Sequence, residues 1–411
     1  MSRTRSRIAA CLVSAFTSLA LITPLSAQAE PAGHRADWIG TWHAAMTGPG
    51  GSGPSADGFT DTTLRQVAHL SVGGDSVRVR LSNAYGEDPL TVGSVTVAPR
   101  SDDAAGTPDV DADLLTPVTF GGETSVTIPA GADWVSDPVD ITVRDDSDLV
   151  VSMYLPGPTG PATFHSAGYS TSFTAQGDAT TDTGSAFTRL DRSRYFLSGV
   201  DVTARAKGSV VFFGDSITDG VVSTVDANLR YPDQVADRLL RRPDPRECGV
   251  LNSGISGNRL LTDAGTAGDS ALSRFDRDVL SRPGVRSVVL LEGINDIGNS
   301  RGSLEPEQLI AVYRQFIARA HDAGLTVVGA TLTPFEGAGY YTEAGEADRQ
   351  AVNEWIRTSG EFDAVVDFDA AVRDPEHPTR FLPAYDVGDH LHPNDAGFAA
   401  MAAAIDLRTI C

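Results

Sequence analysis

A Gly-Asp-Ser turn follows a run of apolar residues in the middle of the chain. The run is VVFF at 210–213, and the turn ends at Ser216. Four apolar, β-prone residues before a turn predict a buried strand, and ligands of open α/β sheets bind at the carboxyl ends of the strands. Ser216 is therefore a candidate nucleophile, which needs a base and an oxyanion hole from other parts of the chain.

An aspartate and a histidine three residues apart occur near the C-terminus, in the sequence DHLHP at 389–393. This spacing lets a turn bring the side chains of Asp389 and His392 together. A neutral imidazole can accept the serine proton, and a carboxylate can orient the ring. The D-x-x-H pair is a weak signal by itself, because the same residues can cap a helix and leave the histidines on the surface.

Two loops between these motifs contain groups that could stabilise an oxyanion. Gly254 follows one predicted strand in NSGISGN at 252–258, and Asn295 follows the next in EGIND at 292–296. The backbone N–H of Gly254 and the side-chain amide of Asn295 are suitable donors. Each loop alone could be an ordinary βα connection, in which glycine and asparagine are common.

Two other features compete with this interpretation. Gly-Asp-Ser occurs again at 268–270, but no apolar strand precedes it, so we interpret Asp269 or Ser270 as a helix N-cap. His390 and His392, with aspartates nearby, could suggest a metal. Zinc sites need three or four converging ligands, and the serine constellation already uses His392. We expect neither a metal nor a cofactor.

After about residue 204, predicted strands alternate with predicted helices. Apolar runs predict strands at 209–213, 250–252, 287–291, 326–331 and 364–367, with helices between them and the clearest helix at 306–323. This pattern predicts an α/β domain over 204–411, with a five-stranded parallel sheet covered by helices on both faces.

The preceding part of the chain has a different pattern. Apolar and polar residues alternate at 77–81, 95–97, 124–128 and 141–143, with turn signals between these segments and a more apolar strand at 149–155. Short strands without a long helical run predict an antiparallel β-sandwich, which we expect to form an accessory domain over 30–203.

Four motifs in this order resemble the GDSL, or SGNH, hydrolase family: GDS at 214–216, NSG at 252–254, GIND at 293–296 and DHLH at 389–392. The resemblance covers residues 205–411, with Ile217 in place of the leucine of G-D-S-L. It implies a three-layer α/β/α, flavodoxin-like fold and hydrolysis of acyl esters. The whole arrangement is similar to secreted bacterial two-domain esterases of this family, including xylan-associated acylesterases.

The resemblance also implies roles for individual residues. Ser216 would be the nucleophile, His392 the base and Asp389 the acid that orients it. The oxyanion hole would consist of the Ser216 backbone, the Gly254 backbone and the Asn295 side chain. The sequence has no G-x-S-x-G motif, which argues against an ordinary α/β-hydrolase nucleophile elbow.

The first 29 residues predict a cleavable secretory signal peptide. Three arginines precede an apolar stretch at 8–25, and an A-x-A sequence follows at 27–29. Cleavage would remove Cys11 with this segment, so that the secreted chain would keep only Cys248 and Cys411. A disulfide between these two residues is plausible in an oxidising compartment. Two free buried thiols are the alternative. We expect no stable membrane insertion, since no later stretch is apolar enough to span a bilayer.

The leading hypothesis is a secreted serine esterase that acts through an acyl-enzyme. Alternatives are a carbohydrate acetylesterase that acts on acetylated polysaccharide, a lipase for longer acyl chains, or a binding module with an inert hydrolase half. The net charge of −22 repels nucleic acid and anionic membranes, so the expected partner is a small ester or an acylated glycan. Three tryptophans could stack on sugars, although the sandwich core is their favoured place: Trp38, Trp42 and Trp134. The oligomeric state is left open.

Overall fold

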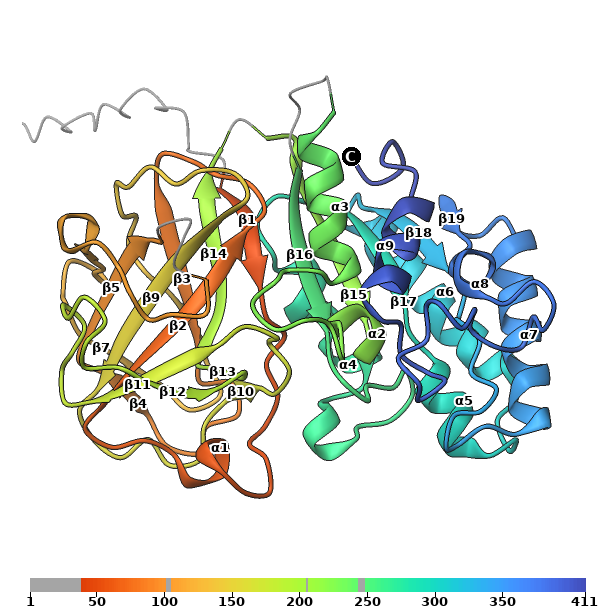
Figure 1. The fold of residues 1–411 in the computed structure, drawn as a ribbon, viewed down its shortest axis with the longest axis horizontal. Coiled ribbons are helices and arrows are strands. Elements are labelled where there is room, and N and C mark those ends of the chain that lie inside the picture. The colour runs from red at the N-terminus through yellow and green to blue at the C-terminus, as the bar shows by residue number, and fades with distance from the viewer. Residues whose placement is uncertain (1–37, 101–104, 205, 243–247) are drawn as a thin grey trace, which may run out of the picture. The chain divides into compact units, whose positions relative to one another are not determined.

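Five parallel strands form one sheet in the order β16-β15-β17-β18-β19 in the computed structural model, which describes residues 38–100, 105–204, 206–242 and 248–411 (Figure 1). Gly214 in β15 pairs with Gly254 in β16 and with Leu291 in β17. These three strands end side by side, so the loops that follow them meet at one edge of the sheet. The strands are β15 (Gly208–Gly214), β16 (Cys248–Gly254), β17 (Val285–Leu291), β18 (Thr326–Ala330) and β19 (Ala364–Val366).

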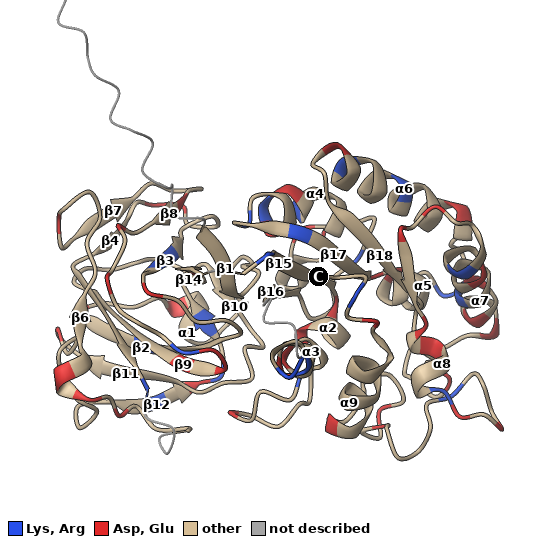
Figure 2. Ribbon diagram, turned by 90° about the horizontal axis from the view of Figure 1, so that it is seen from above, with Lys and Arg blue, Asp and Glu red and all other residues tan. Residues whose placement is uncertain are grey.

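Helices cover both faces of this sheet. Figure 2 shows α4 and α6 on one face and α3 and α9 on the other. The three-layer α/β/α fold and its five-stranded parallel sheet are therefore confirmed. The helices of this part are α2 (Ser216–Asp219), α3 (Tyr231–Leu240), α4 (Ala271–Phe275), α5 (Ile294–Ser300), α6 (Pro306–Asp322), α7 (Glu343–Thr358), α8 (Phe368–Val372) and α9 (Asp395–Ala404), with a 3-10 segment at Gly265–Ala267 and a π-helical turn at Asp276–Leu280.

The central strand β15 has apolar side chains on both faces because helices pack above and below it. All four residues at 210–213 are fully buried. Phe213 contacts Phe275 and Phe316, with ring centroids 5.5 and 5.9 Å away. The run is apolar without alternation because both faces of the strand are covered.

The N-terminal part is β-rich, and its two larger sheets have the orders β1-β14-β3-β8 and β12-β11-β2-β9-β5-β6. The strand pairs are antiparallel, and residues of both sheets share one apolar core. The predicted antiparallel sandwich is therefore confirmed. Its elements are β1 (Trp38–His43), α1 (Pro54–Asp57), β2 (Thr62–Leu70), β3 (Val77–Ser82), β4 (Leu90–Val92), β5 (Ser94–Pro99), a 3-10 segment (Ala112–Leu114), β6 (Thr116–Pro117), β7 (Val126–Ile128), β8 (Asp133–Val135), β9 (Ser147–Leu155), β10 (Phe164–His165), β11 (Ser172–Gln176), β12 (Thr188–Asp191), β13 (Arg194–Tyr195) and β14 (Leu197–Thr203).

One predicted strand of the sandwich is absent. The alternating segment at 141–143 makes only an isolated bridge, between Val143 and Gly74. Val143 is buried, but Ile141 is only partly covered, so this short segment contributes little apolar surface to the core. The alternation at 141–143 predicted a strand, and the structure has only this bridge.

The two parts of the chain share hydrogen bonds, and the described residues from 38 onward belong to one compact unit. The hydroxyl of Ser209 on β15 donates to the carbonyl of Gly40 at 2.9 Å, and the N–H of Val250 on β16 donates to the hydroxyl of Ser71 at 2.8 Å. The division into an accessory domain over 30–203 and a catalytic domain over 204–411 stays a prediction. None of the helices among the described residues has the length and hydrophobicity of a transmembrane span. The predicted signal peptide and Cys11 lie outside the described residues.

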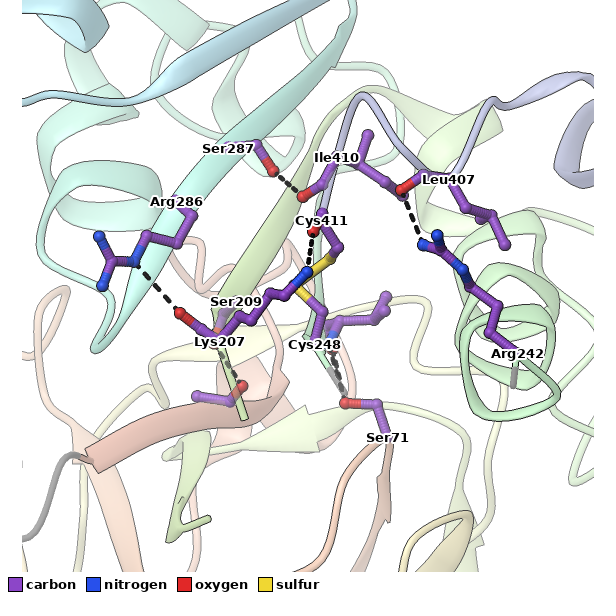
Figure 3. The surroundings of a disulfide bond; sticks show 12 residues. Ser71, Lys207, Ser209, Arg242, Cys248, Arg286, Ser287, Leu407, Ile410 and Cys411 are labelled. Carbon is purple, nitrogen blue, oxygen red and sulfur yellow. Dashed lines mark hydrogen bonds between the residues drawn. A yellow bond between two sulfur atoms is a disulfide. The ribbon is translucent and has the colours of Figure 1, made fainter. Parts of the chain in front are cut away.

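A disulfide joins Cys248, the first residue of β16, to Cys411 (Figure 3). Two nearby hydrogen bonds hold the same end of the chain: the Ser287 hydroxyl donates to the Ile410 carbonyl at 2.6 Å, and the Lys207 ammonium donates to the Cys411 carbonyl at 3.2 Å. The disulfide lies at the beginning of β16, whereas the loop with Gly254 follows its end. It is thus at the edge of the sheet opposite Ser216.

Candidate active site

The turn after β15 places Ser216 at the start of helix α2. Asp215 is the N-cap of this helix, and its carboxylate accepts a hydrogen bond of 2.9 Å from the N–H of Ile217. A side chain at Gly214 would come within 2.2 Å of the Leu291 carbonyl, so only glycine lets β15 and β17 approach this closely at the turn. Ser216 is 5% exposed, and its hydroxyl lies at the carboxyl edge of the sheet.

Ser216, His392 and Asp389 form a chain of hydrogen bonds. His392 Nε2 lies 2.8 Å from Ser216 Oγ, and His392 Nδ1 lies 2.6 Å from Asp389 Oδ2. Because the carboxylate accepts a hydrogen bond from Nδ1, the proton of the neutral ring belongs on Nδ1, which leaves Nε2 free to accept the proton of the serine hydroxyl. This arrangement can generate a serine nucleophile.

The backbone around Asp389 orients its carboxylate toward the ring. Asp389 Oδ1 accepts hydrogen bonds from the N–H groups of Leu391 and His392, at 2.9 and 2.8 Å. Partial burial acts to raise the pKa of Asp389, but the hydrogen bonds from His392 and from these backbone groups outweigh it and hold the pKa below its ordinary value. The carboxylate therefore stays ionised while the ring takes up a proton.

The predicted oxyanion donors differ in whether they already donate a hydrogen bond within the protein. Ser216 lies in the first turn of α2, where backbone N–H groups have no partner in the helix. The N–H of Gly254 already donates to Asn252 Oδ1 at 2.9 Å. Three residues later, Gly257 has an N–H without a hydrogen bond to any described residue. Gly257 is thus a second candidate donor of this loop, which we missed in the sequence although it belongs to the same NSGISGN segment.

Asn295 is held in one orientation by two neighbours. Its Nδ2 group donates to the carbonyl of Asn258 at 3.0 Å, and its Oδ1 atom accepts a hydrogen bond from the Tyr340 hydroxyl at 3.3 Å. The second hydrogen of Nδ2 is left for another acceptor. Since Asn258 directly follows Gly257, these contacts also place Asn295 beside the loop that contains both candidate backbone donors.

A buried arginine joins the three loops beneath the site. The guanidinium of Arg274 donates to the carbonyls of Gly214 and Ser253, at 2.9 and 2.8 Å, and to Asn258 Oδ1 at 2.8 Å. It also lies 3.7 Å from the carboxylate of Glu292. Arg274 thereby contacts the ends or loops of β15, β16 and β17. We did not predict this residue from the sequence, because nothing local distinguishes it from the other arginines.

Two buried carboxyls lie next to this arginine. Asp215 Oδ2 and both carboxyl oxygens of Glu292 have no hydrogen-bond partner among the described residues. Burial raises the pKa of Asp215 to about 7, and the charges of Asp296 and Asp219 act in the same direction. Burial also raises the pKa of Glu292 well above its ordinary value, and the charge of Asp215 adds to this increase.

Part of the chain that contains this site matches a known protein family. Residues 212–400 match the model of the GDSL-like Lipase/Acylhydrolase family. These residues form a GDSL-like lipase/acylhydrolase domain. No curated protein matches the chain.

Solved structures that are similar to part of this chain include an acetyl xylan esterase and a GDSL-like lipase. An acetyl xylan esterase from Geobacillus stearothermophilus is 22% identical, with a TM-score of 0.39 over 50% of this chain and 95% of that one. A GDSL-like lipase from Bacteroides thetaiotaomicron is 21% identical, with a TM-score of 0.35 over 48% of this chain and 84% of that one.

The GDSL-like domain has Ile217 in place of the leucine of the family name. Ile217 is 1% exposed and belongs to the core of the domain, so the substitution keeps the apolar contact. The family places the domain among hydrolases that act on esters.

The other residues singled out in the sequence lie apart from the hydrogen-bonded chain of the GDSL-like domain. Ser270 is the N-cap residue of α4, and its hydroxyl pairs with that of Ser273 at 2.9 Å. His390 Nδ1 lies 2.6 Å from the carboxylate of Asp386. Over the described ranges, no three His, Cys, Asp or Glu side chains are arranged to hold a metal ion.

Proposed function

We propose that this protein is a secreted serine esterase, with Ser216 as nucleophile, His392 as base and Asp389 as the residue that orients the base. The observation that carries the proposal is the hydrogen bond of 2.8 Å between His392 Nε2 and Ser216 Oγ, with Asp389 Oδ2 2.6 Å from His392 Nδ1. The GDSL-like domain supports ester hydrolysis as the reaction. The predicted signal peptide and the disulfide support secretion.

Acylation begins when Ser216 Oγ attacks the ester carbonyl carbon and its proton passes to His392 Nε2. The carbonyl π electrons move to oxygen, and the oxyanion accepts hydrogen bonds from the N–H of Ser216, the Asn295 side chain and an N–H of the loop 254–257. When the oxyanion collapses, the bond to the alcohol oxygen breaks and His392 returns the proton to that oxygen. The product is an acyl-serine and a free alcohol.

Deacylation repeats these steps with water. His392 Nε2 takes a proton from a water molecule as the water oxygen attacks the acyl carbon. The resulting oxyanion uses the same donors, and its collapse breaks the bond to Ser216 Oγ, which regains a proton from His392. A carboxylic acid leaves and the free enzyme is restored. Two rounds of proton transfer through one ring require no cofactor.

The proposal is tested with Ser216→Ala and activated acetyl and butyryl nitrophenyl esters. The variant should show no burst of nitrophenol and no steady turnover above background. Ser270→Ala, which changes the second Gly-Asp-Ser, is the matched control and should keep the wild-type burst. Full activity of Ser216→Ala would overturn the assignment.

The substrate class is tested separately on the purified full-length protein. Acetate release from acetylated xylan is compared with hydrolysis of nitrophenyl esters of short and long acyl chains. Preferential release from the polymer would assign a carbohydrate acetylesterase, and a preference for long chains would assign a lipase. The tryptophans considered for sugar stacking differ in exposure: Trp42 is 8% exposed and Trp134 is 39% exposed, so only Trp134 of these two presents a substantial open surface.

A further inference from the structure

The loop that directly follows α2, the helix that begins with Ser216, is hydrogen-bonded to the β-rich part. The N–H of Asp226 donates to the carbonyl of Tyr169 at 3.0 Å, and the carboxylate of Asp226 accepts hydrogen bonds of 2.6 Å from both the N–H and the hydroxyl of Thr171. Within this loop Val222 has a φ of 67°, a strained conformation for a β-branched residue. Contacts from a distant segment of sequence thus fix a strained loop next to the site.

The same segment contributes a buried histidine that pairs with the last residue of α2. His165 Nε2 lies 3.0 Å from Asp219 Oδ1, and His165 Nδ1 lies 2.9 Å from the carbonyl of Ala45. His165 is 5% exposed and Asp219 is 1% exposed. Both ring nitrogens face groups that accept hydrogen bonds from them, so the ring carries a proton on each and is an imidazolium.

The charges around the ring favour this state. Burial and the nearby charge of Arg194 lower the pKa of His165. The charge of Asp219 and the hydrogen bonds to Asp219 and Ala45 raise this pKa by more, so that it lies above its ordinary value. Arg230, before α3, is a second cation that interacts with Asp219. The His165 ring and Asp219 thus stay paired in a site that also contains the cations of Arg194 and Arg230.

Asp219 connects this histidine with both sides of the candidate site. It ends α2, three residues after Ser216, and its Oδ2 atom accepts a hydrogen bond of 3.1 Å from the N–H of Ser256. A side chain at Gly254 would come within 2.1 Å of the Asp219 backbone nitrogen, so the two backbones are in close contact there. Asp219 thus fixes the distance between α2 and the loop that contains the N–H groups of Gly254 and Gly257.

We propose that His165 is a positioning residue of the hydrolase site, which holds Asp219 so that Ser216 and the backbone donors of 254–257 keep the separation that the oxyanion requires. The inference rests on the proposed esterase function. The β-rich part would accordingly be a component of the active site and not a separable accessory. Since buried ion pairs contribute little net stability, we test the effect of the His165–Asp219 pair on the geometry of the site and not its effect on stability.

The test compares variants of the full-length protein on one nitrophenyl ester. His165→Ala should lower kcat about 10- to 100-fold with KM nearly unchanged, because a small displacement of the reacting groups affects the transition state more than binding. His165→Gln keeps a neutral donor toward Asp219 and should restore part of kcat. If His165→Ala does not fold, His165→Gln alone carries the comparison.

The pH profile separates positioning from simple loss of stability. The pKa of His165 is raised, so the charged pair is present at low pH and is lost as pH rises through that pKa. The wild type should lose kcat as pH rises above the ordinary histidine pKa and through the raised pKa of His165, whereas His165→Gln, which does not titrate there, should lack this decrease.

His43→Gln is the matched control. His43 is also a buried histidine of the β-rich part, but its Nδ1 donates to the Ser198 carbonyl at 2.7 Å, and burial lowers its pKa to about 3. The variant should keep the wild-type kcat and pH profile. An unchanged kcat and pH profile in His165→Ala, or equal losses in the His165 and His43 variants, would overturn the inference alone. No hydrolysis by the wild type would overturn the proposed function and this inference together.

Discussion

The guanidinium of Arg274 donates a hydrogen bond of 2.9 Å to the carbonyl of Gly214, two residues before Ser216. The arginine is 1% exposed and also holds Ser253 and Asn258, so one cation fixes the turn of the serine against the loop of the candidate donors. A helix on one face of the sheet therefore determines the geometry at the edge of the sheet. This contact links the stability of the fold to the geometry of the candidate site.

Arg274→Met should destabilise the protein by about 3–5 kcal/mol and abolish esterase activity, because it leaves buried carbonyls and the carboxylate of Asp278 without this partner. Urea denaturation and nitrophenyl ester hydrolysis measure the two effects. Arg319→Met is the control: Arg319 pairs with the exposed carboxylate of Asp276 at 2.7 Å, and its loss should cost about 1 kcal/mol or less. Equal costs for the two variants would contradict the role of Arg274.

Asn295→Ala should lower kcat about 10²–10³-fold with little change in KM, since the side-chain amide is proposed to bind the oxyanion and not the ground-state ester. Tyr340→Phe should lower kcat only about two- to tenfold, because it removes the hydrogen bond of 3.3 Å to Asn295 Oδ1 but leaves the amide in place. Steady-state kinetics on one activated ester measure both. A larger decrease in kcat for Tyr340→Phe than for Asn295→Ala would contradict the roles proposed for these two residues.

Asp215→Asn should change the dependence of stability on pH. The pKa of Asp215 rises from 3.8 to about 7 in the folded protein, chiefly through burial, so the folded state binds more protons than the unfolded state between these values. Its contribution to the free energy of unfolding is therefore present at low pH and falls as pH rises toward about 7. Asparagine keeps an oxygen that can cap α2 but does not titrate.

The stability of Asp215→Asn relative to the wild type should accordingly increase between pH 5 and pH 8, which urea denaturation at several pH values would measure. Asp113→Asn, a change at an exposed position of the β-rich part, should leave the profile of the wild type unaltered. A difference between Asp215→Asn and the wild type that stays constant with pH would show that the buried charge does not affect folding.

Removal of the disulfide should reduce stability without reducing activity at 25 °C. Cys248 and Cys411 are 163 residues apart in the chain, and the chain-entropy model gives about 5 kcal/mol for a loop of this length. The activity should persist because Cys248 begins β16, whereas the loop of the site follows the end of that strand. Urea denaturation and ester hydrolysis with and without reductant measure both quantities.

The double variant Cys248→Ser, Cys411→Ser provides the control for reduction. It should have the stability of the reduced wild type and should not respond to reductant. A decrease in kcat that parallels the loss of the disulfide in a folded sample would contradict the separation of this bond from the site.

The sequence predicted those features that depend on local pattern and on the rule that parallel strands end at one edge. The apolar run before Ser216 predicted β15, and the motifs at 252–258 and 292–296 predicted which loops lie beside it. The short spacing of Asp389 and His392 allowed the contact that the structure has between their side chains. Ser270 was set apart from Ser216 by its lack of a preceding strand, and it lies in an N-cap.

Pairings between distant residues could not be predicted in this way. Arg274 and Gly214 are 60 residues apart, and His165 and Asp219 are 54 apart, so neither pair has a local pattern. The hydrogen bond that the Gly254 N–H donates to Asn252 Oδ1 depends on the side-chain conformation of Asn252 near the end of β16. The segment at 141–143 has the alternation of a strand, but it forms only an isolated bridge.

In the proposed reaction Ser216 carries the acyl group during turnover. The most direct measurement is acid quenching of the full-length protein during the burst with a butyryl nitrophenyl ester, followed by peptide mass spectrometry. We expect a butyryl group on Ser216, none on Ser270, and none anywhere in Ser216→Ala. Turnover with the acyl group on another residue, or undiminished turnover by Ser216→Ala, would contradict it.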